Sequence, residues 1–267
     1  MKHRRSFPRG MKVGIAFVSL LGGLACQSTL PPRMPLEPDD PRPAAWLRAH
    51  ETRADARSSL RGALRLSLDA PDLRFRRPQR LAVRRPADLR LEILGLFGQV
   101  AAVLVTDGVT FQSFDAARGA VESGEVTDDL LWRIARVDLL PEEAVELLLG
   151  APMPSHEATV SAAFARPGGG ISLDLRDSGG QMRDRIDFDA EGRVVDFIRY
   201  DANERVIWHA TFADYREHAG DEFAYDVHMR FPEVDAEATL VFDDASLHVD
   251  LADELFALRT RDGKARQ

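Results

Sequence analysis

Residues 89–98 read Leu-Arg-Leu-Glu-Ile-Leu-Gly-Leu-Phe-Gly, an alternating segment that runs into an apolar turn. In residues 89–93 apolar side chains alternate with charged ones, which is the period-two pattern of a strand with one buried face. The turn that follows places two large apolar side chains, Leu96 and Phe97, between glycines. Because turns normally carry polar residues, these side chains either fold back onto the core or protrude toward an apolar partner.

The same alternation recurs on both sides of this segment and predicts an antiparallel all-β meander. Residues 60–68 alternate small or apolar residues with mostly polar ones, which indicates a strand with one solvated face. Short strands separated by Gly or Asn turns are typical of such a meander. Further strands are expected at residues 80–84, 100–105, 109–114, 171–175, 183–189, 194–200, 205–212, 225–231, 236–242 and 247–251.

Three helices are expected to lie against this sheet. Residues 43–58 begin with Pro43 and carry one apolar stripe, formed by Trp46, Leu47, His50 and Ala54. Two shorter amphipathic helices are expected after Thr127 and after Pro141. Helices this short gain stability mainly by packing on another element, so we predict that they form lids over the sheet.

The amino-terminal 25 residues contain five basic residues, no acidic residue and an apolar run at residues 13–25. This pattern is typical of a secretory signal and is too short for a comfortable membrane span. Cys26, the only cysteine, follows directly and predicts a lipobox, in which cleavage leaves a diacylated amino-terminal cysteine. The alternative is an ordinary cleaved signal with an incidental thiol.

The remaining organisation follows from composition. Residues 26–42 are rich in proline and predict a tether that joins the anchored cysteine to a domain at 43–258, with a polar tail at 259–267. Gln27 is not the aspartate that retains many bacterial lipoproteins at the inner membrane. We therefore expect lipid attachment to the outer membrane, with the domain facing the periplasm.

Charge and motifs argue against nucleic-acid binding and against catalysis. Loss of the five basic signal residues makes the mature chain more acidic than its formal net charge of −8, whereas nucleic acid requires a Lys/Arg footprint. The sequence contains no Gly-x-Ser-x-Gly elbow, no phosphate loop and no pair of histidines at zinc-ligand spacing. We therefore expect no enzyme activity, no cofactor and no metal site.

The apolar face of the predicted sheet is either a filled core or the wall of a cavity. Small barrels are usually filled by side chains, whereas a lipid pocket needs mostly apolar walls and few polar groups. If there is a cavity, the predicted lining residues are Leu64, Leu66, Leu89, Leu91, Ile93, Phe111, Leu131, Ile134, Leu148, Trp208, Phe212, Met229 and Phe231.

Several segments together resemble LolB, the outer-membrane receptor family of bacterial lipoprotein sorting, and LolB-like lipoproteins. They are residues 89–93, the tip at 96–98, the run Ile-Ala-Arg-Val-Asp-Leu-Leu-Pro at 134–141 and the run Leu-Leu-Leu-Gly-Ala-Pro at 147–152. The resemblance implies a mainly β fold: an unclosed antiparallel β-barrel, the LolA/LolB-like half-barrel, with an amino-terminal helix and short lid helices. The chain departs from the family at Phe97, where leucine after proline is usual.

The resemblance also implies a function. The chain would be a monomeric, lipid-anchored, non-enzymatic acceptor that takes acyl chains of lipoproteins from a periplasmic LolA-like carrier and aids their insertion into the outer membrane. By position, Leu96 and Phe97 would occupy the protruding loop that delivers the cargo. Because fold does not determine function, an envelope assembly or interaction lipoprotein without lipid transfer is the alternative.

Overall fold

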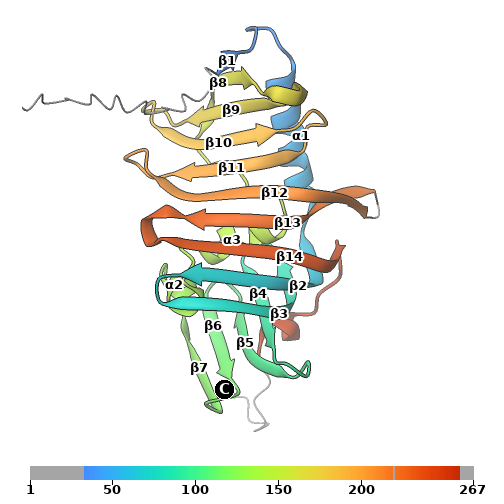
Figure 1. Cartoon of the computed structure of the whole chain (residues 1–267), viewed down its shortest axis with the longest axis vertical. Helices are drawn as coiled ribbons and strands as arrows, with labels where there is room; N and C mark the ends of the chain where they lie inside the picture. Colours follow the sequence, from blue (N-terminus) through green and yellow to red (C-terminus); the bar gives the residue numbers. More distant parts are fainter. Residues whose placement is uncertain (1–32, 219, 259–267) are drawn as a thin grey trace, which may run out of the picture. The chain divides into compact units, whose positions relative to one another are not determined.

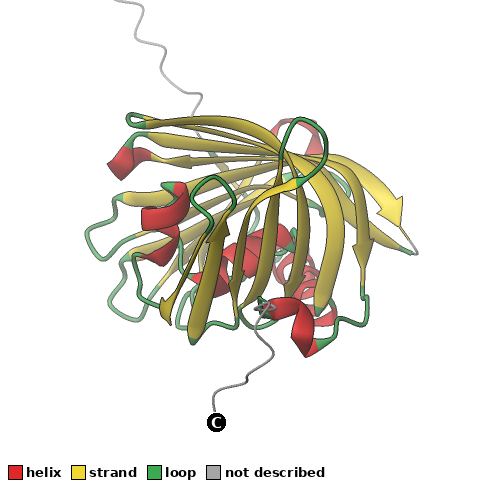
Figure 2. Cartoon of the chain, turned by 90° about the horizontal axis from the view of Figure 1, so that it is seen from below, coloured by secondary structure: helices red, strands yellow, loops and turns green. Residues whose placement is uncertain are grey.

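The computed structural model describes residues 33–218 and 220–258, which form one curved antiparallel sheet with helices against its concave face (Figures 1 and 2). The predicted signal, Cys26 and the predicted tail at 259–267 lie outside the described residues.

The helices are α1 (Arg42–Ala56), α2 (Leu130–Ala135) and α3 (Pro141–Leu148), with short 3-10 turns at Pro167–Gly169, Pro232–Val234 and Asp253–Phe256. The strands are β1 (Met34–Pro35), β2 (Ser59–Ala70), β3 (Leu73–Arg84), β4 (Asp88–Leu94), β5 (Val100–Thr106), β6 (Thr110–Asp115), β7 (Ala120–Glu125), β8 (Thr159–Ala165), β9 (Ile171–Arg176), β10 (Met182–Phe188), β11 (Val194–Tyr200), β12 (Val206–His218), β13 (Asp221–Phe231) and β14 (Ala236–Leu247).

Two meanders build this sheet. Its strand order is β1-β8-β9-β10-β11-β12-β13-β14-β2-β3-β4-β5-β6-β7, so one meander runs through β8–β14, the other runs through β2–β7, and β1 adds to the edge at β8. They join where β14 pairs with β2, from Glu237 opposite Asp69 to Leu247 opposite Leu60. In the described part of the chain β1 and β7 are the two edges and do not pair with each other, so the barrel stays open. This confirms the predicted fold class.

The alternation along β2 determines which side chains face the concave side of the sheet. Leu60 and Leu64 are buried on the inner face, while Arg61 and Arg65 are exposed on the outer one. A strand presents successive side chains to opposite faces, so one register fixes both surfaces. The apolar inner face explains why the helices pack on that side, as Figure 2 shows.

A buried arginine holds the ends of two helices against the sheet. Arg57, just after α1, donates to the carboxylate of Asp221 at the start of β13, at 2.6 and 2.7 Å. It also donates to the carbonyls of Leu149 and Gly150 at the end of α3, at 3.1 and 3.2 Å. Burial raises the pKa of Asp221, but the hydrogen bonds and charge of Arg57 outweigh that effect and leave this pKa below its usual value.

The strand predicted at residues 80–84 begins earlier in the structure and includes a basic segment of β3. This strand begins at Leu73 and so includes Arg74, Arg76 and Arg77, whereas the sequence predicted strand only from residue 80. Pro78 interrupts the alternating pattern in the sequence. β4 pairs with β3 only from Gln79 onward, so Pro78 lies in a part of β3 that β4 does not flank. Proline is tolerated at such an unpaired edge.

Other boundaries also differ. The predicted strand at 247–251 is wrong, because β14 ends at Leu247 and the next residues form no ladder. The sequence analysis missed β7 and β8. Within the predicted tether at 26–42, Met34 and Pro35 pair with Ala165 and Phe164 of β8, so these two residues belong to the sheet.

Candidate functional site

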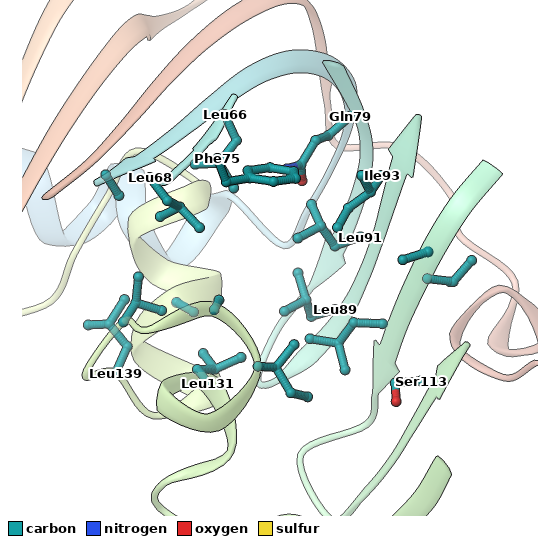
Figure 3. A pocket seen from close by; sticks show the side chains of 18 of the residues that line it. Leu66, Leu68, Phe75, Gln79, Leu89, Leu91, Ile93, Ser113, Leu131 and Leu139 are labelled. Atoms are coloured by element: carbon teal, nitrogen blue, oxygen red, sulfur yellow. The ribbon is translucent and has the colours of Figure 1, made fainter. Parts of the chain in front are cut away.

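An apolar cavity of about 540 Å³ lies between α2, α3 and the concave side of β2–β6, β13 and β14 (Figure 3). Its volume falls within the roughly 300–1,000 Å³ typical of ligand sites. Its apolar lining comes from the sheet through Leu64, Leu66, Leu68, Leu73, Phe75, Leu89, Leu91, Ile93, Leu104, Val227, Met229, Ala238, Leu240 and Phe242, and from the helical segment through Leu131, Ile134, Val137, Leu139, Ala144, Leu147 and Leu148.

Leucine side chains on both walls face this space. In Figure 3, Leu89 and Leu91 on β4 face Leu131 and Leu139 of the helical segment across it. Leu91 and Leu66 are only half-buried, although both lie on the concave face. Close packing would bury leucines at such positions almost completely. This end of the concave face is therefore the wall of a cavity.

The predicted lining residues divide into two groups. Nine of the predicted residues line the cavity: Leu64, Leu66, Leu89, Leu91, Ile93, Leu131, Ile134, Leu148 and Met229. The other four do not line it and are buried in the core: Phe111, Trp208, Phe212 and Phe231. They share the inner face with the cavity residues, but other side chains fill the space around them.

Aromatic packing fills the part of the concave face that carries β10–β12. Trp208 stacks on Phe197 with ring centroids 5.2 Å apart. Trp46 of α1 packs against Phe188 at 6.1 Å, and the buried ring of His50 lies edge-on to the same phenylalanine at 6.2 Å. Aromatic side chains bury large areas. Together with α1 they leave a solid core beside the open cavity.

A part-buried ion-pair network fixes the start of α3 above the sheet. Arg199 of β11 pairs with Glu143 of α3 at 2.8 Å and with Asp184 of β10 at 3.1 Å. It also donates to the carbonyl of Met153 at 2.7 Å. Burial opposes the charge of Arg199, but the two carboxylates outweigh burial and raise its pKa. This network, with the Arg57 contacts at the other end, holds α3 at both termini.

Charged residues surround the outer part of the cavity. Arg133 of α2 pairs with Glu122 of β7 at 3.5 Å, and Arg118 pairs with Asp115 at 3.4 Å. These four residues line the cavity, and all except Asp115 are exposed. The cavity thus reaches the surface between α2 and the β6–β7 hairpin. Exposed ion pairs contribute little stability, so this contact can open at small cost.

The turn between β4 and β5 protrudes from the fold. Leu96 is 84% exposed and Phe97 is 93% exposed. The amide of Gly98 donates to the carbonyl of Gly95 at 3.0 Å, and the amide of Phe97 donates to the side chain of Gln99 at 3.0 Å. Of the two alternatives left open by the sequence, the structure has the protruding one. Ile93, two residues before this turn, lines the cavity.

Gln79 is a cavity residue that the sequence analysis missed. It lies on β3 between Leu64 of β2 and Ile93 of β4, and its side chain lines the cavity (Figure 3). Only 1% of it is exposed. Within residues 33–218 and 220–258 neither atom of its amide group has a hydrogen-bond partner. Its signal in the sequence is a polar residue on the inner face of an otherwise apolar sheet.

The described residues offer no group of three or more His, Cys, Asp or Glu side chains arranged for a metal ion. His209 on β12 lies 2.6 Å from the carboxylate of Asp196 on β11 and is part-buried. None of the helices in this part of the chain has the length and apolar character needed to cross a membrane.

No protein-family model and no curated protein sequence matches this chain. Solved structures nevertheless share its architecture. A DUF1329 family protein from Desulfovibrio piger superposes with a TM-score of 0.56 at 13% identity, covering 82% of this chain and 98% of that one. A LolA superfamily protein from Nitrosomonas europaea gives 0.51 at 10% identity, covering 79% and 97%. This chain has the LolA-type fold.

A third structure, a putative outer membrane lipoprotein-sorting protein domain from Vibrio parahaemolyticus, gives a TM-score of 0.48 at 12% identity, covering 79% of this chain and 94% of that one. At identities this low the likeness concerns the fold. The first two structures confirm the resemblance inferred from sequence at the level of the LolA/LolB fold, while LolB-like function is a separate question.

Proposed function

We propose that this protein is a lipid-anchored, non-enzymatic acceptor that binds acyl chains of lipoproteins and aids their insertion into the outer membrane. The observation that carries the proposal is the apolar cavity of about 540 Å³ beneath α2 and α3. Binding an acyl chain there removes its methylene groups from water, at about 0.8 kcal/mol per buried CH₂. The LolA-type fold supports the proposal but does not decide it.

The arrangement suggests a path for the cargo. An acyl chain enters between α2 and the β6–β7 hairpin, where the exposed pair Arg133–Glu122 separates at little cost. It then lies against the leucines of β2 and β4. Leu96 and Phe97 contact the bilayer from the protruding turn and bring the loaded cavity to the membrane surface. A periplasmic LolA-like carrier is the proposed donor.

Blocking the cavity tests the proposal. Leu91 is half-buried and faces the open space, so a Leu91→Trp side chain should occupy the cavity with little strain. Val241 lies on the outer face of β14 and is 37% exposed, so Val241→Trp is the matched control. We expect Leu91→Trp to weaken binding of a fluorescent palmitoylated lipopeptide at least tenfold, whereas Val241→Trp should bind like the wild type.

Two results would overturn this function. The wild-type protein could fail to bind the lipopeptide, or both tryptophan variants could bind it equally well. Stoichiometric co-purification of an envelope protein, with no bound lipid detected by mass spectrometry, would favour the assembly or interaction role instead.

Anchoring is tested separately at the amino terminus. If Cys26 carries the lipid, Cys26→Ser should release the protein from the membrane fraction or leave its signal uncleaved. Gln27→Asp should keep the lipid but shift the protein toward the inner membrane. A Cys26→Ser protein that stays fully membrane-bound after signal cleavage would contradict the anchor.

A further inference from the structure

The amide of Gln79 lies in a place where a strand normally carries an apolar side chain. Its neighbours across the sheet are Leu64 on β2 and Ile93 on β4, and all three side chains line the cavity. In Figure 3 Gln79 projects from β3 into the space that is also lined by Ile93, Leu66 and Phe75. Gln79 is 1% exposed, and neither its Nε2 nor its Oε1 has a partner among the described residues.

Such a group lowers the stability of the empty protein. Buried amides are almost always hydrogen-bonded, because desolvation without a partner is unfavourable. A leucine at this position would complete the apolar wall and avoid that cost. The amide is therefore explained by a partner that enters the cavity with a ligand.

The surroundings of Gln79 restrict the chemistry of that partner. The other cavity side chains beside it are apolar, and a charged group placed among them would lose its hydration. An uncharged carbonyl fits better, since the amide can donate two hydrogen bonds and accept others. In an acylated ligand, this group is the ester or amide carbonyl that joins the hydrocarbon chain to its head group.

We infer that Gln79 hydrogen-bonds to the acyl carbonyl of the ligand, so that the cavity distinguishes acylated molecules from plain hydrocarbon. This inference rests on the proposed acyl-binding function and adds a specificity residue to it. Nε2 donates to the carbonyl oxygen, while the chain lies along the leucines of β2 and β4. Ester and amide linkages of a lipoprotein both present a carbonyl oxygen, so the same hydrogen bond can form with either.

Competition binding tests the inference. Methyl decanoate, N-methyldecanamide and dodecane each compete with a fluorescent apolar reporter for the full chain. We expect the wild type to bind the ester and the amide about tenfold more tightly than dodecane, as one additional hydrogen bond allows. Gln79→Leu should abolish or reverse that difference while still binding dodecane. The same change at the exposed Gln181, outside the cavity, should leave the preference intact.

A second variant guards against misfolding. Gln79→Met keeps the length of the side chain without its amide and should behave like Gln79→Leu, with a melting temperature equal to or above that of the wild type. A preference for the carbonyl ligands that persists in both variants would overturn the role of Gln79 and leave acyl binding intact. Failure of all three ligands to bind the wild type would overturn the proposed function together with this inference.

Discussion

Charge placed at the protruding turn should abolish membrane delivery without unfolding the protein. Leu96 and Phe97 are 84% and 93% exposed, so replacing both with glutamate removes almost no packing. Exposed substitutions usually change the free energy of unfolding by less than about 0.5 kcal/mol. Insertion of the two native side chains into a bilayer contributes roughly 1.5–3 kcal/mol each. Their loss corresponds to at least about a hundredfold weaker partitioning, before the cost of desolvating glutamate is added.

The assay follows transfer of a fluorescent lipopeptide from the unanchored protein to acceptor liposomes, beside a thermal melt of each variant. Val109→Glu is the control, because Val109 is 70% exposed in the turn between β5 and β6, at the opposite end of β5. We expect the double variant to bind lipopeptide normally and fail in transfer, whereas the control transfers normally. Normal transfer by the double variant would refute the role of the turn, and a large fall in melting temperature would place both residues in the core.

Three further predictions concern stability. Burial lowers the pKa of His50 to about 4, so protonation of the unfolded chain should reduce stability by up to about 3 kcal/mol as the pH falls from about 6.5 to 4. His50→Gln should flatten the pH dependence of the free energy of unfolding measured in urea. An equal pH dependence in the variant and the wild type would contradict this. Arg57→Met leaves the Asp221 carboxylate and three carbonyls, those of Leu149, Gly150 and Glu222, without their donor. It should lower the free energy of unfolding measured in urea by about 3–5 kcal/mol, and a loss below about 1 kcal/mol would contradict this. Gly150 has φ +65°, and a Cβ there would lie 3.1 Å from the ring of Phe223. Gly180 has φ +81°, but a Cβ there would meet nothing within 4 Å. Gly150→Ala should therefore lower the melting temperature more than Gly180→Ala does.

Sequence pattern was sufficient wherever burial alternates along a single strand. The alternation in residues 60–68 and 89–93 predicted β2 and β4, because a two-residue period places every second side chain on the buried face. It failed for β7, whose six residues are all exposed and so carry no contrast between faces. It also failed for the start of β3, where Arg77 and Pro78 hide a strand that lacks a β4 partner.

Only tertiary structure decided which part of the apolar face is hollow. Leu91 and Trp208 look alike in sequence, since each is an inward-facing apolar residue on a strand. Trp208 is enclosed by Phe197 and the start of α3, whereas Leu91 faces a space that no side chain fills. That difference depends on where Arg57 and Arg199 hold α3, through contacts that join residues 46 to 164 positions apart in the chain. Local periodicity records which side of a strand faces inward, and packing between distant elements determines what it faces.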